Sequence, residues 1–239
     1  MSVLMVVRHG QASFLAENYD KLSPLGERQA RLLGEYWVSH GLQFTHVYYG
    51  PAERQIRTGE IIGDVFRSAG LSWPEPIAEP DLDEFPAEKV VRTFLPVLMD
   101  RHPHMAQLVE EFQTATEMEK KRRLFDRVLR EVSERWLDGE VADDSFPTWP
   151  AFCSRVANAV LRVIDTAPPS SSVAVFTSAG PMAATARAAL DLSHSATLNL
   201  TWSPRNASFS EFFFTTGRFS LSTFNTTPHL RNSDLLTYR

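Results

Sequence analysis

Apolar and polar residues along the chain follow a pattern that predicts strands alternating with helices. Residues 3–7, Val-Leu-Met-Val-Val, form a continuous apolar run, which is typical of a strand buried on both faces. Residues 173–176 have the same character, and 44–49 predict a further strand. Near the C-terminus, Phe alternates with Thr and Ser over 209–216 and 219–224, on either side of a Thr-Gly pair. This alternation predicts a hairpin at one edge of the sheet.

Helices are predicted between these strands. Ser23 is a favourable N-cap, Pro24 suits the first helical position, and Gly41 lies near the end of the apolar periodicity. The other predicted helices run from the Gly50-Pro51 turn to about 66, from 150 to about 165, and from 178 to 190. Strand and helix alternation followed by an antiparallel pair predicts a three-layer α/β/α fold with a mostly parallel central sheet.

The middle of the chain has a different composition. Residues 104–138 are rich in Glu, Arg, Leu and Met and contain no Gly or Pro, so they predict one long helix or two. Prolines at 86, 96 and 103 are expected to punctuate the approach to this helical stretch. We expect a helical insertion or cap at about 83–148 within a single domain covering 1–239. The basic tract at 119–123 has acidic neighbours and predicts a solvated helix face.

Composition narrows the class of protein. The chain has 239 residues, a net charge of −5 and one cysteine, Cys153. One cysteine excludes an internal disulfide and fits a reducing compartment, and its apolar flanks predict a core thiol. The net negative charge argues against a broad nucleic-acid or anionic-membrane surface. The apolar N-terminal run has no basic leader, and no uncharged stretch is long enough for a membrane helix. We therefore expect a cytoplasmic protein, whose Phe-rich edge leaves the oligomeric state open.

Chemically useful residues follow the predicted strands. In open α/β sheets, ligands bind beyond the carboxyl ends of the strands. Arg8 and His9 follow the first strand, Arg54 follows the second, and Ser178 with Ala179 follows the third. Guanidinium groups bind phosphate oxygens and stay charged, and a neutral imidazole is a competent nucleophile near pH 7. The pattern predicts an anion site beside a nucleophilic histidine.

Six segments in chain order resemble the histidine phosphatase superfamily, the phosphoglycerate-mutase-like proteins. They are VVRHGQ at 6–11, LSPLGERQA at 22–30, PAER at 51–54 followed by Thr58, LDE at 82–84, NAS at 206–208 and FNTTPHL at 224–230. The resemblance covers most of the chain and implies a metal-independent phosphatase that acts on a small phosphorylated substrate.

The resemblance also implies roles for individual residues. His9 would be phosphorylated and Glu84 would protonate the leaving oxygen. The phosphoryl oxygens would be held by Arg8, Arg54, Gln11, Ser178 and Ala179. Water would then hydrolyse the phosphohistidine, or a second hydroxyl would accept the phosphoryl group as in a mutase. No cofactor is implied, and the close pair His102 and His104 lacks the neighbouring carboxylates of a metal site.

Two features depart from the family pattern. Ser178 stands where the family has a second histidine, a donor whose loss costs on the order of 10²–10³ in rate. After Glu84 the expected glycines are missing, so Asp83, Glu79 and Asp81 compete for the role of the acid. A weakly active or inactive phospho-ligand-binding protein on the same fold is the alternative hypothesis.

A third hypothesis is a serine hydrolase. Ser178 lies at a strand-to-helix turn, as a hydrolase nucleophile does, with His194 or His229 downstream as the base. Phe176 occupies the position where that turn expects a glycine, and this hypothesis assigns no role to Arg8, His9 and Arg54.

Overall fold

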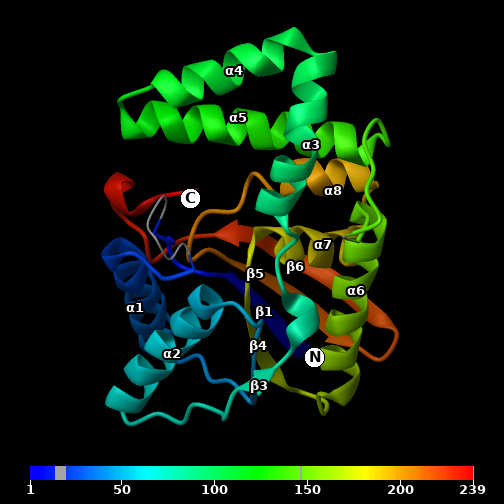
Figure 1. Cartoon of the computed structure of the whole chain (residues 1–239). Helices are drawn as coiled ribbons and strands as arrows, with labels where there is room; N and C mark the ends of the chain where they lie inside the picture. Colours follow the sequence, from blue (N-terminus) through cyan, green and yellow to red (C-terminus); the bar gives the residue numbers. More distant parts are fainter. Residues whose placement is uncertain (14–19, 146, 239) are drawn as a thin grey trace. The chain divides into compact units, whose positions relative to one another are not determined.

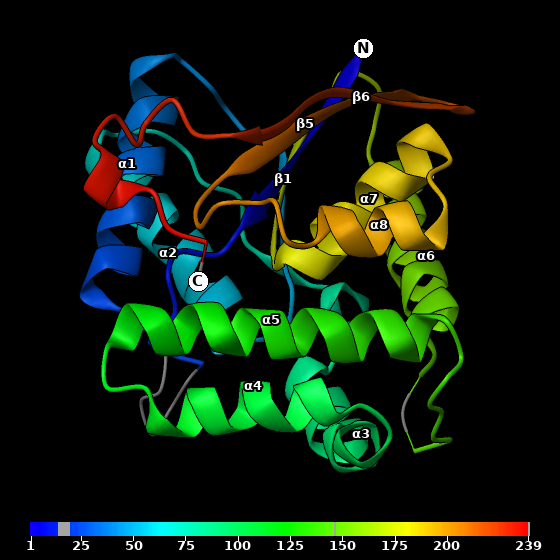
Figure 2. The same ribbon diagram turned by 90° about the horizontal axis from the view of Figure 1, so that it is seen from above.

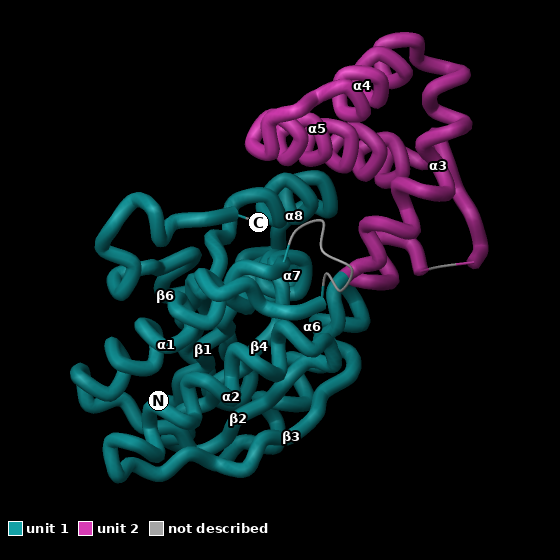
Figure 3. The backbone as a smooth tube through the Cα atoms, turned by 60° about the vertical axis from the view of Figure 1, so that its left-hand side comes forward, with its two compact units in different colours: residues 1–84, 153–239 teal, residues 85–152 magenta. Residues whose placement is uncertain are grey.

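The structure is a computed structural model that describes residues 1–13, 20–145 and 147–238. The chain divides into two compact units, coloured separately in Figure 3. One unit comprises residues 1–84 and 153–239, and the other comprises residues 85–152. The expectation that the chain forms a single domain with an insertion at about 83–148 stays a prediction.

The first unit is built on a six-stranded mixed sheet with the order β3-β2-β4-β1-β5-β6. The first four of these strands in that order are parallel, and β5 and β6 are antiparallel to their neighbours. The predicted mostly parallel sheet and C-terminal hairpin are therefore confirmed. The strands are β1 (Ser2–Arg8), β2 (His46–Tyr49), β3 (Ile77–Ala78), β4 (Ser172–Thr177), β5 (Phe209–Thr215) and β6 (Arg218–Thr226).

Helices cover both faces of the sheet, as Figures 1 and 2 show. Helices α1 (Pro24–Ser39) and α2 (Glu53–Ser68) lie on one face, and α6 (Trp149–Thr166) and α7 (Ala179–Leu190) lie on the other, with α8 (His194–Leu200) beside α7. The three-layer α/β/α prediction is confirmed. Short 3-10 turns occupy Pro80–Leu82 and Ser233–Leu235.

The core between the sheet and the first helix pair is strongly aromatic. Trp37, Phe66 and Phe176 are fully buried there, and each such side chain removes a large apolar area from water. Ser23 caps α1 as the sequence predicts, since its hydroxyl accepts a hydrogen bond of 3.1 Å from the Gly26 N–H group. On the other face, Cys153 is buried, and burial raises the pKa of its thiol to about 11. The predicted core thiol is confirmed.

The second unit contains α3 (Ala87–Arg101), α4 (Pro103–Thr114) and α5 (Met118–Leu137). The predicted helical stretch is thus two helices, α4 and α5, and Pro103 opens the first of them. Of the three prolines expected to punctuate the approach to this stretch, Pro96 lies inside α3, which continues through it. The buried side chains of this unit include Phe94, Leu98, Met105, Leu129 and Val132, so its helices pack around apolar residues of their own.

Two features concern the nucleic-acid-binding and membrane-spanning classes that the sequence argues against. The tract 119–123 lies in the first turns of α5, and its side chains are exposed or half-buried. Among the described helices, none is both long and apolar enough to cross a membrane.

Candidate active site

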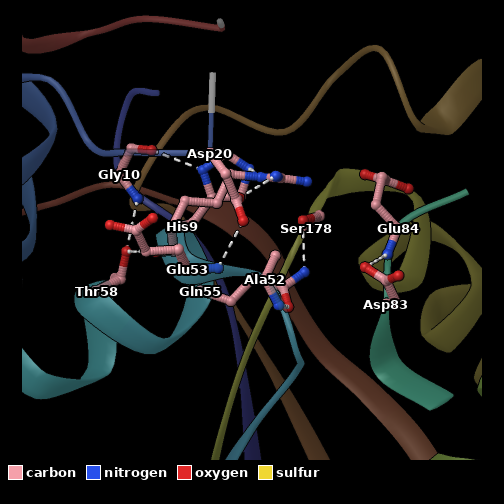
Figure 4. Close-up of polar contacts among 11 residues, drawn as sticks. His9, Gly10, Asp20, Ala52, Glu53, Gln55, Thr58, Asp83, Glu84 and Ser178 are labelled. Atoms are coloured by element: carbon pink, nitrogen blue, oxygen red, sulfur yellow. Dashed lines mark hydrogen bonds and ion pairs between the residues drawn. The ribbon is translucent and has the colours of Figure 1, made fainter. Parts of the chain in front are cut away.

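The carboxyl ends of β1 and β4 lie side by side and carry the central residues of the site (Figure 4). The strands are in parallel register, with Arg8 opposite Thr177, and the N–H group of His9 donates to the Thr177 carbonyl over 2.9 Å. His9 and Ser178 therefore leave neighbouring strands at the same edge of the sheet. This is the geometric reason why residues 169 positions apart share one site.

The backbone of His9 is also held from the C-terminal part of the chain. Its carbonyl oxygen accepts hydrogen bonds from the Ala207 N–H group at 3.0 Å and from the Asn206 amide at 3.4 Å. Asn206 is itself fixed by the tail, since its N–H group donates to the Thr237 carbonyl over 2.8 Å. The NAS segment noted in the sequence thus holds the backbone of His9 through its carbonyl oxygen.

The imidazole of His9 has a defined tautomer. Nδ1 lies 2.7 Å from the Gly10 carbonyl oxygen, which can only accept, so Nδ1 carries the proton. Nε2 is then an acceptor, and it receives a hydrogen bond of 3.1 Å from Nε of Arg54. Burial, followed by the positive charges of Arg54 and Arg8, holds the pKa of His9 well below its usual range. His9 is therefore neutral near pH 7, with the lone pair of Nε2 directed at a guanidinium.

Arg54 is held from two sides. Besides its contact with His9, its Nη1 forms an ion pair of 2.5 Å with Oδ1 of Asp20. The other oxygen of Asp20 accepts the backbone N–H group of Glu53 over 2.9 Å, at the first residue of α2. Asp20 thus binds both the start of the helix and the side chain that the helix presents, which is a favourable position for an anion.

The last residue of β1 and the residues that follow His9 are tightly enclosed. Arg8 is buried, and its Nη1 donates to the Pro204 carbonyl oxygen. A Cβ built on Gly10 would lie 2.3 Å from the Gly26 carbonyl oxygen, so glycine is needed here for the close approach of the loop to α1. The Gln11 side chain accepts the Ser23 hydroxyl over 2.9 Å. The site residues from 8 to 11 are thus fixed by contacts with several elements.

Ser178 is buried and precedes α7, whose first residue is Ala179. The Ser178 hydroxyl oxygen accepts a hydrogen bond of 2.7 Å from Nε2 of Gln55, on α2. In the described part of the chain, the side-chain partner of Ser178 is this amide and not an imidazole. The arrangement that the serine hydrolase hypothesis needs, a histidine bonded to the serine, is therefore not seen among these residues.

The four candidate acids occupy different surroundings. Glu79 and Asp81 form ion pairs with Arg162 at 2.8 and 2.6 Å. Asp83 accepts the Glu84 backbone N–H group over 2.8 Å. Glu84 itself accepts the Gly180 N–H group over 3.1 Å, at the start of α7 and two residues beyond Ser178. Of the four, Glu84 is the acid whose side chain contacts the turn that carries Ser178.

The two close histidines lie in the other unit and bind carboxylates separately. His102 contacts Glu140 and His104 contacts Glu131, each over 2.6 Å. Across the ranges 1–13, 20–145 and 147–238, no group of three or more His, Cys, Asp or Glu residues is arranged to hold a metal ion.

Sequence reasoning missed two residues that contact the site. Asp20 has no recurring pattern around it, and its ion pair with Arg54 spans 34 positions. Gln55 had a usable signal, because Gln is a favoured third residue of a helix, where it accepts the N–H group of the N-cap. Its side chain does so with Ala52 over 3.1 Å, but its second contact, with Ser178, depends on the fold.

The arrangement suits a tetrahedral anion beside a nucleophile. A neutral imidazole whose Nε2 accepts from Arg54, the guanidinium groups of Arg8 and Arg54, and the start of α7 lie at one edge of the sheet. Positive charges and N–H groups placed in this way can neutralise a bound anion.

A sequence model of the histidine phosphatase superfamily (branch 1) matches residues 4–135 and 111–227. No curated protein gives a significant match.

Solved structures with the same fold have low sequence identity to this chain. Phosphoserine phosphatase from Entamoeba histolytica, solved with phosphoserine, is 15% identical with a TM-score of 0.63 over 96% of this chain and 100% of that one. Phosphoglycerate mutase from Bacillus anthracis is 16% identical with a TM-score of 0.61, covering 95% and 94%. Mycobacterial glucosyl-3-phosphoglycerate phosphatase is 18% identical with a TM-score of 0.59, covering 94% and 99%. The fold is therefore shared across enzymes with different substrates.

Proposed function

This chain belongs to the histidine phosphatase superfamily, and on that premise we propose that it hydrolyses phosphate monoesters of small molecules through a phosphohistidine on His9. The observation that carries the proposal is the state of His9. Its imidazole is neutral, its Nδ1 proton is held by the Gly10 carbonyl, and its Nε2 lone pair points at the guanidinium of Arg54.

The first half of the proposed reaction transfers the phosphoryl group to the enzyme. Nε2 of His9 attacks phosphorus, so that an N–P bond forms while the ester P–O bond breaks. Arg8 and Arg54 hold the phosphoryl oxygens, aided by Gln11, Ser178 and the N–H group of Ala179. Glu84 gives its proton to the leaving oxygen, which departs as an alcohol.

The second half regenerates the enzyme. A water molecule attacks phosphorus and gives a proton to the Glu84 carboxylate, the N–P bond breaks, and inorganic phosphate leaves neutral His9 behind. Because the arginines neutralise the charge, we propose that the reaction needs no metal ion or other cofactor.

Glu84 is the acid that the surroundings favour. Glu79 and Asp81 are engaged by Arg162, whereas Glu84 contacts the N-terminal turn of α7 beside Ser178.

The proposed substrate class is small phosphorylated metabolites. The structures of similar fold include enzymes named for phosphoserine, phosphoglycerate and glucosyl-3-phosphoglycerate, all of which carry a phosphate on a small organic acid or its derivative. We also propose a cytoplasmic location, because a single cysteine fits a reducing compartment.

A second candidate is a phospho-ligand-binding protein with little or no turnover. The sequence resemblance implies that Ser178 takes the place of the family's second histidine, and a serine hydroxyl reaches less far than an imidazole. The anion would then bind without efficient transfer, because the donor to the transferring group is short.

Trapping the intermediate separates these candidates. Purified protein is mixed with a ³²P-labelled phosphate ester and quenched, and acid-labile, base-stable label on His9 is expected together with released inorganic phosphate. Phosphate binding without label or turnover would favour the binding protein. Labelling of Ser178 by a fluorophosphonate would instead support the serine hydrolase hypothesis.

A further inference from the structure

The side chain of Gln55 has a fixed orientation. It is fully buried, and its Oε1 accepts the Ala52 backbone N–H group over 3.1 Å. A backbone N–H group can only donate, so the amide oxygen must face Ala52 and the NH₂ group must face the other way. Nε2 consequently donates to the hydroxyl oxygen of Ser178 over 2.7 Å.

This orientation decides what the Ser178 hydroxyl can do. A serine hydroxyl has one proton and two acceptor positions, and the amide NH₂ group can take nothing from it. No described residue accepts the proton of Ser178. The proton is therefore available to an acceptor other than Gln55, at the edge of the sheet where His9 also lies (Figure 4).

We propose that Gln55 is a positioning residue that makes the Ser178 hydroxyl a dedicated hydrogen-bond donor to the bound phosphoryl group. Gln55 does not touch the anion in this scheme and acts through Ser178. Donation from Gln55 also polarises the hydroxyl, which strengthens the bond that Ser178 gives to an anion. The proposal rests on the proposed function in one respect only, namely that the anion at this edge is a phosphoryl group.

Binding of inorganic phosphate, measured by calorimetry, tests the pair without requiring turnover. Ser178→Ala is expected to weaken phosphate binding about ten-fold, the effect of losing one hydrogen bond to a charged group. Gln55→Leu is expected to weaken it several-fold, because the hydroxyl then rotates freely. If Gln55 acts only through Ser178, the double variant binds phosphate as Ser178→Ala alone does.

Gln55→Glu tests the donor role of Gln55 more directly, because it keeps the helix cap and removes only the amide donor. Its carboxylate still accepts from Ala52, but both oxygens are acceptors, so Ser178 must donate its proton to Glu and none remains for phosphate. The new carboxylate also repels phosphate directly. Making Gln55→Glu in the Ser178→Ala variant measures this repulsion by itself. The loss of affinity caused by Gln55→Glu is expected to be larger when Ser178 is present than when it is absent.

A matched control removes a cap that has no contact with the site. Ser193 caps α8 by accepting the Ala196 N–H group over 3.1 Å, so Ser193→Ala should lower the unfolding temperature slightly and leave phosphate affinity unchanged.

The outcomes distinguish the two proposals. Equal affinity in Gln55→Leu and wild type, or losses that add in the double variant, would overturn the role of Gln55 even if phosphohistidine forms. Non-additive losses in a protein that never forms phosphohistidine would support the role of Gln55 and refute the proposed hydrolysis. A wild-type protein that binds no phosphate would overturn the role of Gln55, whereas trapping of phosphohistidine decides the proposed hydrolysis separately.

Discussion

Nε of Arg54 lies 3.1 Å from Nε2 of His9 and donates a hydrogen bond to it. The guanidinium thus occupies the position in front of the nitrogen that we propose as the nucleophile. An incoming phosphoryl group must enter between the two, accept from the guanidinium and receive the imidazole lone pair. Arg54 consequently has two roles in the proposed reaction, because it keeps His9 neutral before the substrate arrives and neutralises the phosphoryl charge afterwards.

Replacing the proposed nucleophile should remove the activity completely. We expect His9→Ala to show no phosphohistidine and no release of phosphate above background, because the proposed mechanism forms its N–P bond on His9. The matched control is His40→Ala, which removes an exposed histidine at the end of α1 and should be fully active. A chelator should leave wild-type turnover unchanged. Turnover retained in His9→Ala, or lost with the chelator, would contradict the mechanism.

Asp20 should matter for positioning Arg54 more than for binding the substrate. We expect Asp20→Asn to lower kcat about ten-fold with a smaller change in KM, because the lost charge both loosens the guanidinium and reduces repulsion of the substrate phosphate. The control is Glu27→Gln, which breaks the exposed contact of 3.3 Å with Arg57 and should change kcat less than two-fold. Single-turnover formation of phosphohistidine measures the effect, and an unchanged rate in Asp20→Asn would refute this role.

The lowered pKa of His9 predicts activity that persists into mildly acidic solution. Burial and the neighbouring arginines disfavour the imidazolium, so the nucleophile stays neutral below the ordinary histidine pKa of about 6.5. The rate of phosphohistidine formation, measured by rapid quench from pH 7.5 to 5, should not fall with a midpoint near 6.5. A decline centred at that value would show that His9 titrates as an exposed histidine does.

His229 should make the protein less stable in acid. It packs near Tyr36 and Phe209, and burial lowers its pKa to about 4. The unfolded chain, with a histidine pKa of about 6.5, binds more protons between these values, so the free energy of unfolding falls as pH falls from 6.5 to 4. The shift corresponds to about 3 kcal/mol. The free energy of unfolding of wild type and His229→Phe is measured with urea across this pH range, and it should depend less steeply on pH in the variant. The same pH dependence in both proteins would contradict the role of His229.

Ser178→His by itself should lower activity, although the sequence resemblance leads us to expect a histidine at this position. Ser178 is buried and its hydroxyl lies 2.7 Å from the Gln55 amide, so a larger ring meets a filled space and is forced out of position. Pairing it with Gln55→Ala provides room, and we expect kcat/KM on an aryl phosphate to rise above that of the single variant. A single variant that is more active than wild type would show that the space is available without that change.

Local sequence signals located most elements because their causes are local. Ser23 and Pro24 predicted the start of α1, where the cap bond to Gly26 forms, and the continuous apolar run at the N-terminus predicted β1. Pro96 marks no helix boundary, because proline weakens a helix without always ending it. The strand Ile77–Ala78 was missed because it has two residues, both exposed, and so carries no pattern.

The sequence by itself determined the fold class and the residues of the central motif. Apolar periodicity depends on near neighbours, and Arg8, His9 and Arg54 are recognisable because a charged group directly follows a buried strand or opens the next helix. Only the tertiary structure decided which of these groups touch and what their contacts do to them. The low pKa of His9, the Asp20 ion pair and the Gln55 bond to Ser178 all depend on side chains brought together from distant positions. Burial and Coulomb interactions act through space, and distance in space is the quantity that a linear pattern does not contain.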